Sequence, residues 1–176
     1  MAIQYGDGTT SNAGRIIKVE QVTRTDTTST GSSTYADVFS SNVSITPQSN
    51  SSKFLLIGDL KIGYSSYQAA IMWKFVRTVS GVGSYDLFIG DTNNNRSRCT
   101  WGTEEPSDSN NAIYELHTTN GIYLDSPNTT TACTFKVMWK AEQHTAYLNR
   151  THGDGNHAAY PRAASSLTVM EIAGWI

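Results

Sequence analysis

The chain has 176 residues, a formal net charge of −2 and only 16% charged side chains. This length suits one domain with a core of its own, and the missing basic excess argues against direct nucleic-acid binding through the phosphates. The mean hydropathy is −0.37, and neither a membrane-spanning apolar stretch nor a secretory signal is visible, so we expect no membrane insertion.

The polar residues are mostly Ser, Thr and Asn rather than Lys and Glu. Short polar side chains compete for backbone hydrogen bonds inside helices, whereas Thr suits strands and Ser and Asn suit turns. The composition therefore indicates an all-β protein with many loops.

Residues 1–14 carry few apolar side chains and three glycines. Such a segment cannot offset its ordering entropy alone, so we expect a short extended N-terminal arm held by a partner, followed by one domain over 15–176. The residues expected to form this attachment element are its apolar anchors and its glycine turn: Ile3, Tyr5, Gly6, Asp7 and Gly8.

Strand-period segments recur along the rest of the chain, whereas helix-period segments last a couple of turns at most. The expected strands are 15–23, 35–39, 43–46, 53–64, 69–79, 85–89, 97–101, 113–116, 122–124, 131–141, 146–150 and 167–172. Segments 26–33 and 49–52 are expected turns, Asn120-Gly121 is expected to close a hairpin, and 151–164 is a long loop. This spacing predicts an antiparallel β-sandwich, jelly-roll-like.

Period-2 placement in the strongest segments predicts the buried core: Phe54, Leu56, Trp73, Phe75, Phe135, Val137 and Val169. Apolar side chains that alternate to the opposite face are expected to be covered by neighbouring subunits: Leu55, Ile57, Met72 and Met138.

One group of residues near the C-terminus imitates a metal site: His144, His152, Asp154 and His157. Their spacing matches no metal-binding pattern and the segment is rich in glycine, so we interpret it as a solvated loop. The sequence predicts no metal ion and no cofactor.

Two further groups imitate functional sites. Asp91, Asn93 and Asn95 begin like a calcium loop, but Gly102 stands where the bidentate acid is required, so a turn is the better interpretation. A glycosidase would need a pair of carboxylates, and the candidates are Glu104, Glu105 and Glu115. We interpret them instead as residues of a solvated acidic loop.

Two cysteines, Cys99 and Cys133, could pair or stay reduced. We favour free thiols, with Cys133 as a small core residue, because a lone pair of cysteines does not establish a disulfide. No nucleophile elbow, phosphate loop, dinucleotide fingerprint or zinc-protease motif occurs, so we expect no enzymatic activity.

Several short stretches are familiar as a set: Gly6-Asp7-Gly8-Thr9, Ala13-Gly14-Arg15-Ile16-Ile17, Val43-Ser44-Ile45-Thr46-Pro47, Ser51-Ser52-Lys53, Gly90-Asp91 with Arg96 and Arg98, Tyr123-Leu124-Asp125-Ser126-Pro127, Leu148-Asn149-Arg150 and Thr168-Val169-Met170-Glu171-Ile172. Together they resemble a family of small virion proteins of aquatic tailed phages, including cyanophages, that also occurs as outer domains of tail fibres. Loop 151–164 departs from that pattern in being more basic and richer in His.

The resemblance implies a β-sandwich on the virion surface, assembled in the host cytoplasm as a homotrimer, with capsid or tail proteins as partners. Three functions stay open: a capsid-decorating (cement) protein, a tail-fibre or spike component that binds a host surface glycan or protein, and a small surface hydrolase. No coiled-coil or collagen-like shaft is visible, which favours decoration over a fibre tip.

Overall fold

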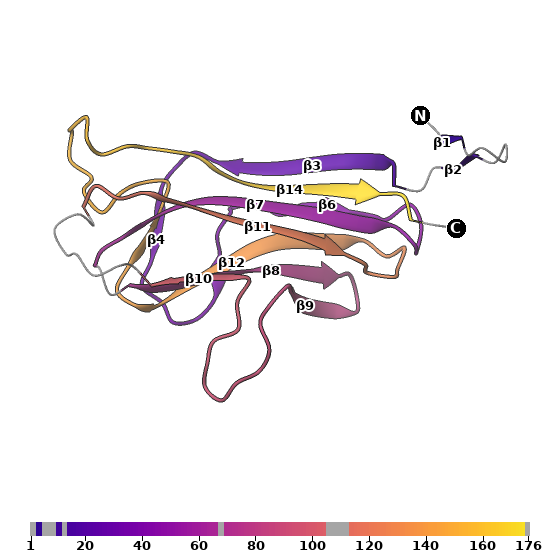
Figure 1. Cartoon of the computed structure of the whole chain (residues 1–176), viewed down its shortest axis with the longest axis horizontal. Coiled ribbons are helices and arrows are strands. Elements are labelled where there is room, and N and C mark those ends of the chain that lie inside the picture. The colour runs from indigo at the N-terminus through magenta and orange to yellow at the C-terminus, as the bar shows by residue number, and fades with distance from the viewer. Residues whose placement is uncertain (1–2, 5–9, 12–13, 67–68, 105–112, 175–176) are drawn as a thin grey trace.

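A computed structural model of the chain describes residues 3–4, 10–11, 14–66, 69–104 and 113–174 (Figure 1). All regular elements in this part of the chain are strands. They are β1 (Ile3–Gln4), β2 (Thr10–Ser11), β3 (Ile16–Arg24), β4 (Thr28–Thr30), β5 (Ala36–Asp37), β6 (Val43–Ile45), β7 (Lys53–Tyr64), β8 (Ala70–Val79), β9 (Gly83–Leu87), β10 (Trp101–Glu104), β11 (His117–Asp125), β12 (Cys133–Gln143), β13 (Ala146–Leu148) and β14 (Ser165–Ile172).

The first sheet, here the β7 sheet, has β3, β14, β7 and β11 across its width. β13 pairs with the end of β7 beyond β14, and β4 pairs with β13. The second sheet, here the β8 sheet, has β12 at the centre beside β8. β5 and β6 pair with the other edge of β12, and β9 and β10 pair with the other edge of β8.

The pairing is nested along the chain, as in a hairpin rolled up on itself. β3 pairs with β14, β6 with β12, β7 with β11, and β8 with β9, all antiparallel. These four pairs divide between two facing sheets (Figure 1), which is the jelly-roll arrangement of two Greek keys. The predicted antiparallel sandwich is therefore confirmed.

The core lies between the two sheets. All seven side chains predicted to be buried are 0% exposed: Phe54, Leu56, Trp73, Phe75, Phe135, Val137 and Val169. On β7, Leu55 and Ile57 alternate to the outer face, as predicted. Met72 and Met138 likewise lie on the outer face of the β8 sheet, half-buried.

Two predictions about turns are wrong. Asn120-Gly121 does not close a hairpin, because β11 runs unbroken from His117 to Asp125. Gly121 lies opposite Gly58 of β7. A Cβ at Gly121 would collide with the ring of Trp73, and a Cβ at Gly58 would collide with the ring of Phe75. These glycines make room for the large rings of the facing sheet rather than forming a turn.

The expected turn at 26–33 contains β4, which pairs with β13. In place of the expected strand at 97–101, the structure has β10 at Trp101–Glu104. The expected strand at 113–116 is turn and irregular backbone. The long loop expected at 151–164 contains no strand, and a single bridge joins Arg150 to Arg162 across it.

Candidate interaction surfaces

The N-terminal segment forms a ladder of its own. In the described part of the chain, β1 and β2 pair only with each other. Of the residues expected to form the attachment element, Ile3 lies in β1, whereas Tyr5, Gly6, Asp7 and Gly8 lie outside the described residues. The attachment role of this segment stays a prediction.

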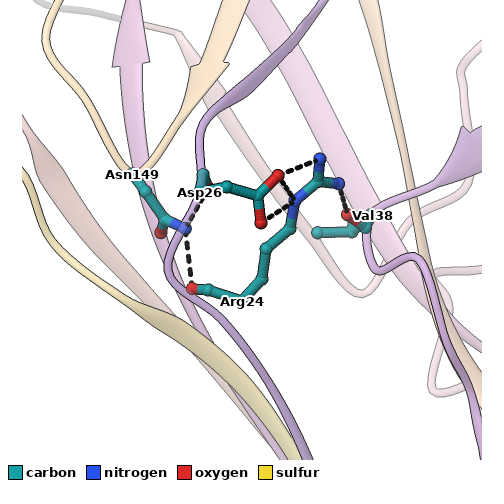
Figure 2. Close-up of polar contacts among 4 residues, drawn as sticks. All are labelled: Arg24, Asp26, Val38 and Asn149. Atoms are coloured by element: carbon teal, nitrogen blue, oxygen red, sulfur yellow. Dashed lines mark hydrogen bonds and ion pairs between the residues drawn. The ribbon is translucent and has the colours of Figure 1, made fainter.

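Asn149, from one of the familiar stretches, ties three segments together. Its side-chain amide donates to the backbone carbonyls of Arg24 at 2.8 Å and Asp26 at 3.0 Å (Figure 2). Its Oδ1 accepts from Ser165 Oγ at 2.6 Å. Asn149 is fully buried and has a φ of 61°, a left-handed conformation in which Asn is enriched. The residue therefore joins the β3–β4 turn to the start of β14.

Arg24 extends this connection to the second sheet (Figure 2). Its Nη1 donates to the carbonyl of Val38, just after β5, at 2.6 Å, and its Nη2 donates to Asp26 at 2.9 Å. Hydrogen bonds from Arg24 hold the pKa of the exposed Asp26 carboxyl below its ordinary value. The contact joins the end of β3, in the β7 sheet, to the residue that follows β5, in the β8 sheet.

Two carboxylates of the familiar stretches accept hydrogen bonds inside the fold. Asp125, at the end of β11, accepts from Arg77 Nη1 of β8 at 2.6 and 2.5 Å, and both side chains are almost buried. Glu171, 2% exposed, accepts from the backbone N–H of Gln48 at 2.6 Å. Both carboxylates therefore have structural roles, Asp125 across the two sheets and Glu171 beneath the loop before β7.

A polar network covers the outer face of the β8 sheet. The Nζ atoms of Lys74 and Lys140 lie 4.2 and 5.1 Å from the ring centroid of Tyr35. Lys140 donates to the Glu142 carboxylate and to Ser97 Oγ, the latter at 2.7 Å. The bond to Lys140 lowers the pKa of Glu142, and burial raises the pKa of Tyr35 far above its ordinary value. Ser97 Oγ in turn donates to the Glu142 carboxylate at 3.1 Å, so the three side chains form a closed network.

The His-containing loop does not gather its members around one point. His152 Nδ1 lies 3.2 Å from the hydroxyl of Tyr147, and Asp154 pairs with Arg150 and Arg162. In the described part of the chain, no group of three or more His, Cys, Asp or Glu side chains is placed to hold a metal ion. His144 adopts a positive φ in the turn after β12.

Aromatic rings and guanidinium groups nevertheless concentrate at this end of the sandwich. Tyr114 stacks on Tyr160 with centroids 5.5 Å apart, and the Arg150 guanidinium lies 3.8 Å from the ring centroid of Tyr147. The Gly153 N–H donates to the carbonyl of Ile113 at 3.0 Å, which joins the two loops. We call these residues the loop-end cluster: Tyr114, Tyr147, Arg150, His152, Asp154, Tyr160 and Arg162.

The remaining candidates do not assemble into sites. Glu115 pairs with His117 at 3.1 Å; Glu105 and the side chain of Glu104 lie outside the described residues. In the calcium-like loop, the Arg96 N–H donates to the carbonyl of Asn93 and closes a turn, as expected. Asp91 and Asn95, the other two members of that loop, are exposed.

The thiols are free, as predicted. Cys133 is buried at the start of β12, and Cys99 is partly buried. Burial raises the pKa of both thiols.

The outer face of the β7 sheet carries exposed apolar side chains, most of which were not predicted from the sequence. Ile122 and Leu124 of β11 are 61% and 47% exposed, and Val19 of β3 is 52% exposed. Ile122 and Leu124 both lie in the expected strand 122–124, but the wrongly expected hairpin separated that short strand from residues 117–121, which belong to the same strand β11.

Searches with the sequence and with the fold give different results. No protein-family model and no curated protein matches the sequence. No helix in the described residues is long and apolar enough to cross a membrane.

Among solved structures, the infectious bursal disease virus VP2 subviral particle matches 94% of this chain and 43% of its own, with 12% identity and a TM-score of 0.43. The same virus's Gt strain matches 94% and 39%, with 13% identity and a TM-score of 0.40. The chain spans less than half the length of these structures. At such low identities and TM-scores the assignment of the jelly roll rests on the strand order itself.

Proposed function

We propose that this chain is a structural protein displayed on the surface of a tailed phage particle, as a homotrimeric subunit that decorates the capsid. The observation that carries the proposal is the nested strand order together with the familiar stretches that occupy it. Jelly rolls are common in viral capsid proteins, although the fold also serves lectins and cupins.

The placement of those stretches supports the proposal. Asn149, Asp125 and Glu171 each connect loops or sheets inside the jelly roll. A resemblance carried by residues with roles inside the fold supports a shared scaffold, and the family that these stretches resemble consists of small virion proteins.

The direct test is the position of the chain in the intact particle. Virions would be imaged by electron cryo-microscopy, and the jelly roll would be fitted into density on the capsid and on the tail. Density in regular copies on the capsid is expected. Density confined to the tail, or absence of the chain from purified particles, would refute capsid decoration.

The N-terminal segment provides a second test. Phage particles that lack this protein would be mixed with a variant from which residues 2–10 are deleted. The variant is expected to fold but not to bind these particles, because the arm is proposed as the attachment element. The matched control is the full chain added to the same particles. If the truncated protein reaches the occupancy of the full chain, the attachment surface lies elsewhere.

The loop-end cluster favours a second candidate function, a tail-fibre or spike component that binds a host glycan. Tyr114 is 48% exposed and stacked on Tyr160, next to the Arg162–Asp154 pair. Exposed rings with nearby hydrogen-bonding groups suit contact surfaces. Binding to host cells that is lost in Tyr114→Ala and retained in Val82→Ala, a distant exposed control, would support this alternative.

A further inference from the structure

The outer face of the β7 sheet has an apolar half that runs across four strands in register. Met170 of β14 lies opposite both Val19 of β3 and Leu55 of β7, and Leu55 lies opposite Leu124 of β11. These four side chains therefore form one continuous row across the sheet.

A second row continues the apolar surface on two strands. Ile57 of β7 lies opposite Ile122 of β11. At the other side of the first row, Ile172 pairs with Ile16, which is 52% exposed. We call these residues the apolar patch: Ile16, Val19, Leu55, Ile57, Ile122, Leu124, Met170 and Ile172.

The same face becomes polar toward the opposite end of the strands. Asn120 lies opposite Asp59, and Thr118 lies opposite Lys61. Asp59 and Lys61 form an ion pair at 2.5 Å. The face is thus divided into an apolar part, with Lys53 at its border opposite Ile172, and a polar part in which Asp59 and Lys61 are paired.

The outer face of the β8 sheet is different, because loops cover it. Val76 there is only 3% exposed, and Lys140, which contacts the Tyr35 ring, is only 7% exposed. No comparable cover lies over the patch among the described residues, where Ile122 is 61% exposed. The two outer faces therefore differ in whether this chain covers its own apolar side chains.

The size of the patch fits the centre of a protein interface. Eight positions on a grid of about 4.8 by 6.7 Å cover roughly 260 Å². A standard interface buries about 800 Å² on each partner, so the patch is about a third of one side. The patch would supply the apolar core of such an interface, and the neighbouring polar side chains would supply its rim.

We propose that the apolar patch packs against a second copy of this chain. The charge distribution favours this occupant, because the centre of the patch has no charged side chain and can meet another copy of this chain without like-charge repulsion. The paired charges of Asp59 and Lys61 at its border likewise present no unbalanced sign. Two sheets can approach face to face at about 10 Å with their side chains interleaved, and most soluble oligomers are built from copies of one chain. The inference rests on this face alone and does not depend on the proposed virion role.

The test compares two charge-matched double variants on the same strand. Ile122→Lys with Leu124→Lys places charges in the patch, and Thr118→Lys with Asn120→Lys places the same charges in the polar half. All four positions are exposed, so melting temperatures should stay close to that of the natural sequence. Masses would be measured by sedimentation from about 1 to about 100 μM, a range in which an interface of this kind assembles.

The natural sequence and the Thr118/Asn120 variant are expected to give a mass of two or more 19.2 kDa chains. The Ile122/Leu124 variant is expected to sediment as a single chain, with association weakened at least about 100-fold. A single-chain mass for the natural sequence would overturn the proposal. An oligomer that persists in the Ile122/Leu124 variant would overturn it as well, because the contact would then lie elsewhere. A single-chain mass would also contradict the proposed homotrimer, whereas the imaging test of capsid decoration is independent of both results.

Discussion

Replacement of Gly121 by alanine tests the packing between the sheets. A Cβ at this position would enter the space of Trp73 Cη2 and lie 3.1 Å from Phe75 Cε2 and 3.2 Å from Thr100 Cγ2. The Trp73 ring cannot move away freely, because its Nε1 donates to Thr119 Oγ1 at 3.0 Å inside the core. The added methyl group must therefore displace a fixed, buried ring.

Overpacking of this kind costs about 1–3 kcal/mol, and loss of the Trp73 hydrogen bond adds about 1 kcal/mol. Replacing glycine returns about 0.4–1 kcal/mol by restricting the unfolded chain. We expect a net destabilisation of about 2–3 kcal/mol, which lowers the melting temperature of a chain this size by about 5–10 °C. The assay is thermal unfolding followed by circular dichroism.

Two further variants make this reasoning refutable. Gly58→Ala would bring its Cβ to 2.9 Å from Phe75 Cε1, so a smaller loss of about 1–2 kcal/mol is expected. Gly90→Ala is the control, because no atom lies within 4 Å of its added Cβ. If Gly121→Ala melts within about 1 °C of the natural sequence, the argument from steric exclusion by Trp73 is wrong.

Three other predictions concern buried polar groups. Asn149→Ala should lower the free energy of unfolding in urea by about 2–4 kcal/mol, because it leaves buried hydrogen-bond partners unpaired and places alanine at positive φ. Asn149→Gly should recover the part of this loss that comes from the positive φ. Asp125→Ala should cost about 3–5 kcal/mol by leaving Arg77 buried without its carboxylate, and the double variant with Arg77→Met should be less destabilised than Asp125→Ala alone. Both thiols should be titratable after unfolding without reductant. In the folded protein Cys133 should stay unreactive toward a disulfide reagent at neutral pH, and the partly exposed Cys99 should react faster as the pH rises, because burial raises both thiol pKa values.

The long central strands could be predicted because successive side chains alternate between the core and the outer face along each strand. β7, β8 and β12 each bury alternate side chains against the facing sheet, so a period of two is written directly in their residues. The same alternation identified the buried residues and the outward direction of Leu55 and Ile57.

The errors arose where a distant contact decides the local structure. Asn-Gly is a strong turn signal in isolation. At Asn120-Gly121 the deciding factor is the Trp73 ring on the other sheet, and no short-range pattern contains that information. β4 was missed for a related reason, since its three residues are ordered by pairing with β13, far along the sequence.

The candidate surfaces were predictable only in part, because a surface depends on register between strands. Leu55 and Ile57 were expected to need cover, yet the continuous row exists only because Val19, Met170 and Leu124 fall opposite one another. The loop-end cluster likewise joins Tyr114 to a loop more than 30 residues away along the chain.

Residues inside the fold and residues on its exposed surfaces should respond differently to substitution. This difference separates residues with a structural role from residues that bind a partner. Asn149 and Asp125 lie inside the fold, so changes there should lower stability and affect every activity in proportion to the folded fraction. Ile122 and Tyr114 are exposed, so changes there should leave the melting temperature in place and alter one kind of binding only. A residue whose substitution weakens particle or cell binding at unchanged stability therefore belongs to a contact surface, whichever of the proposed partners that surface meets.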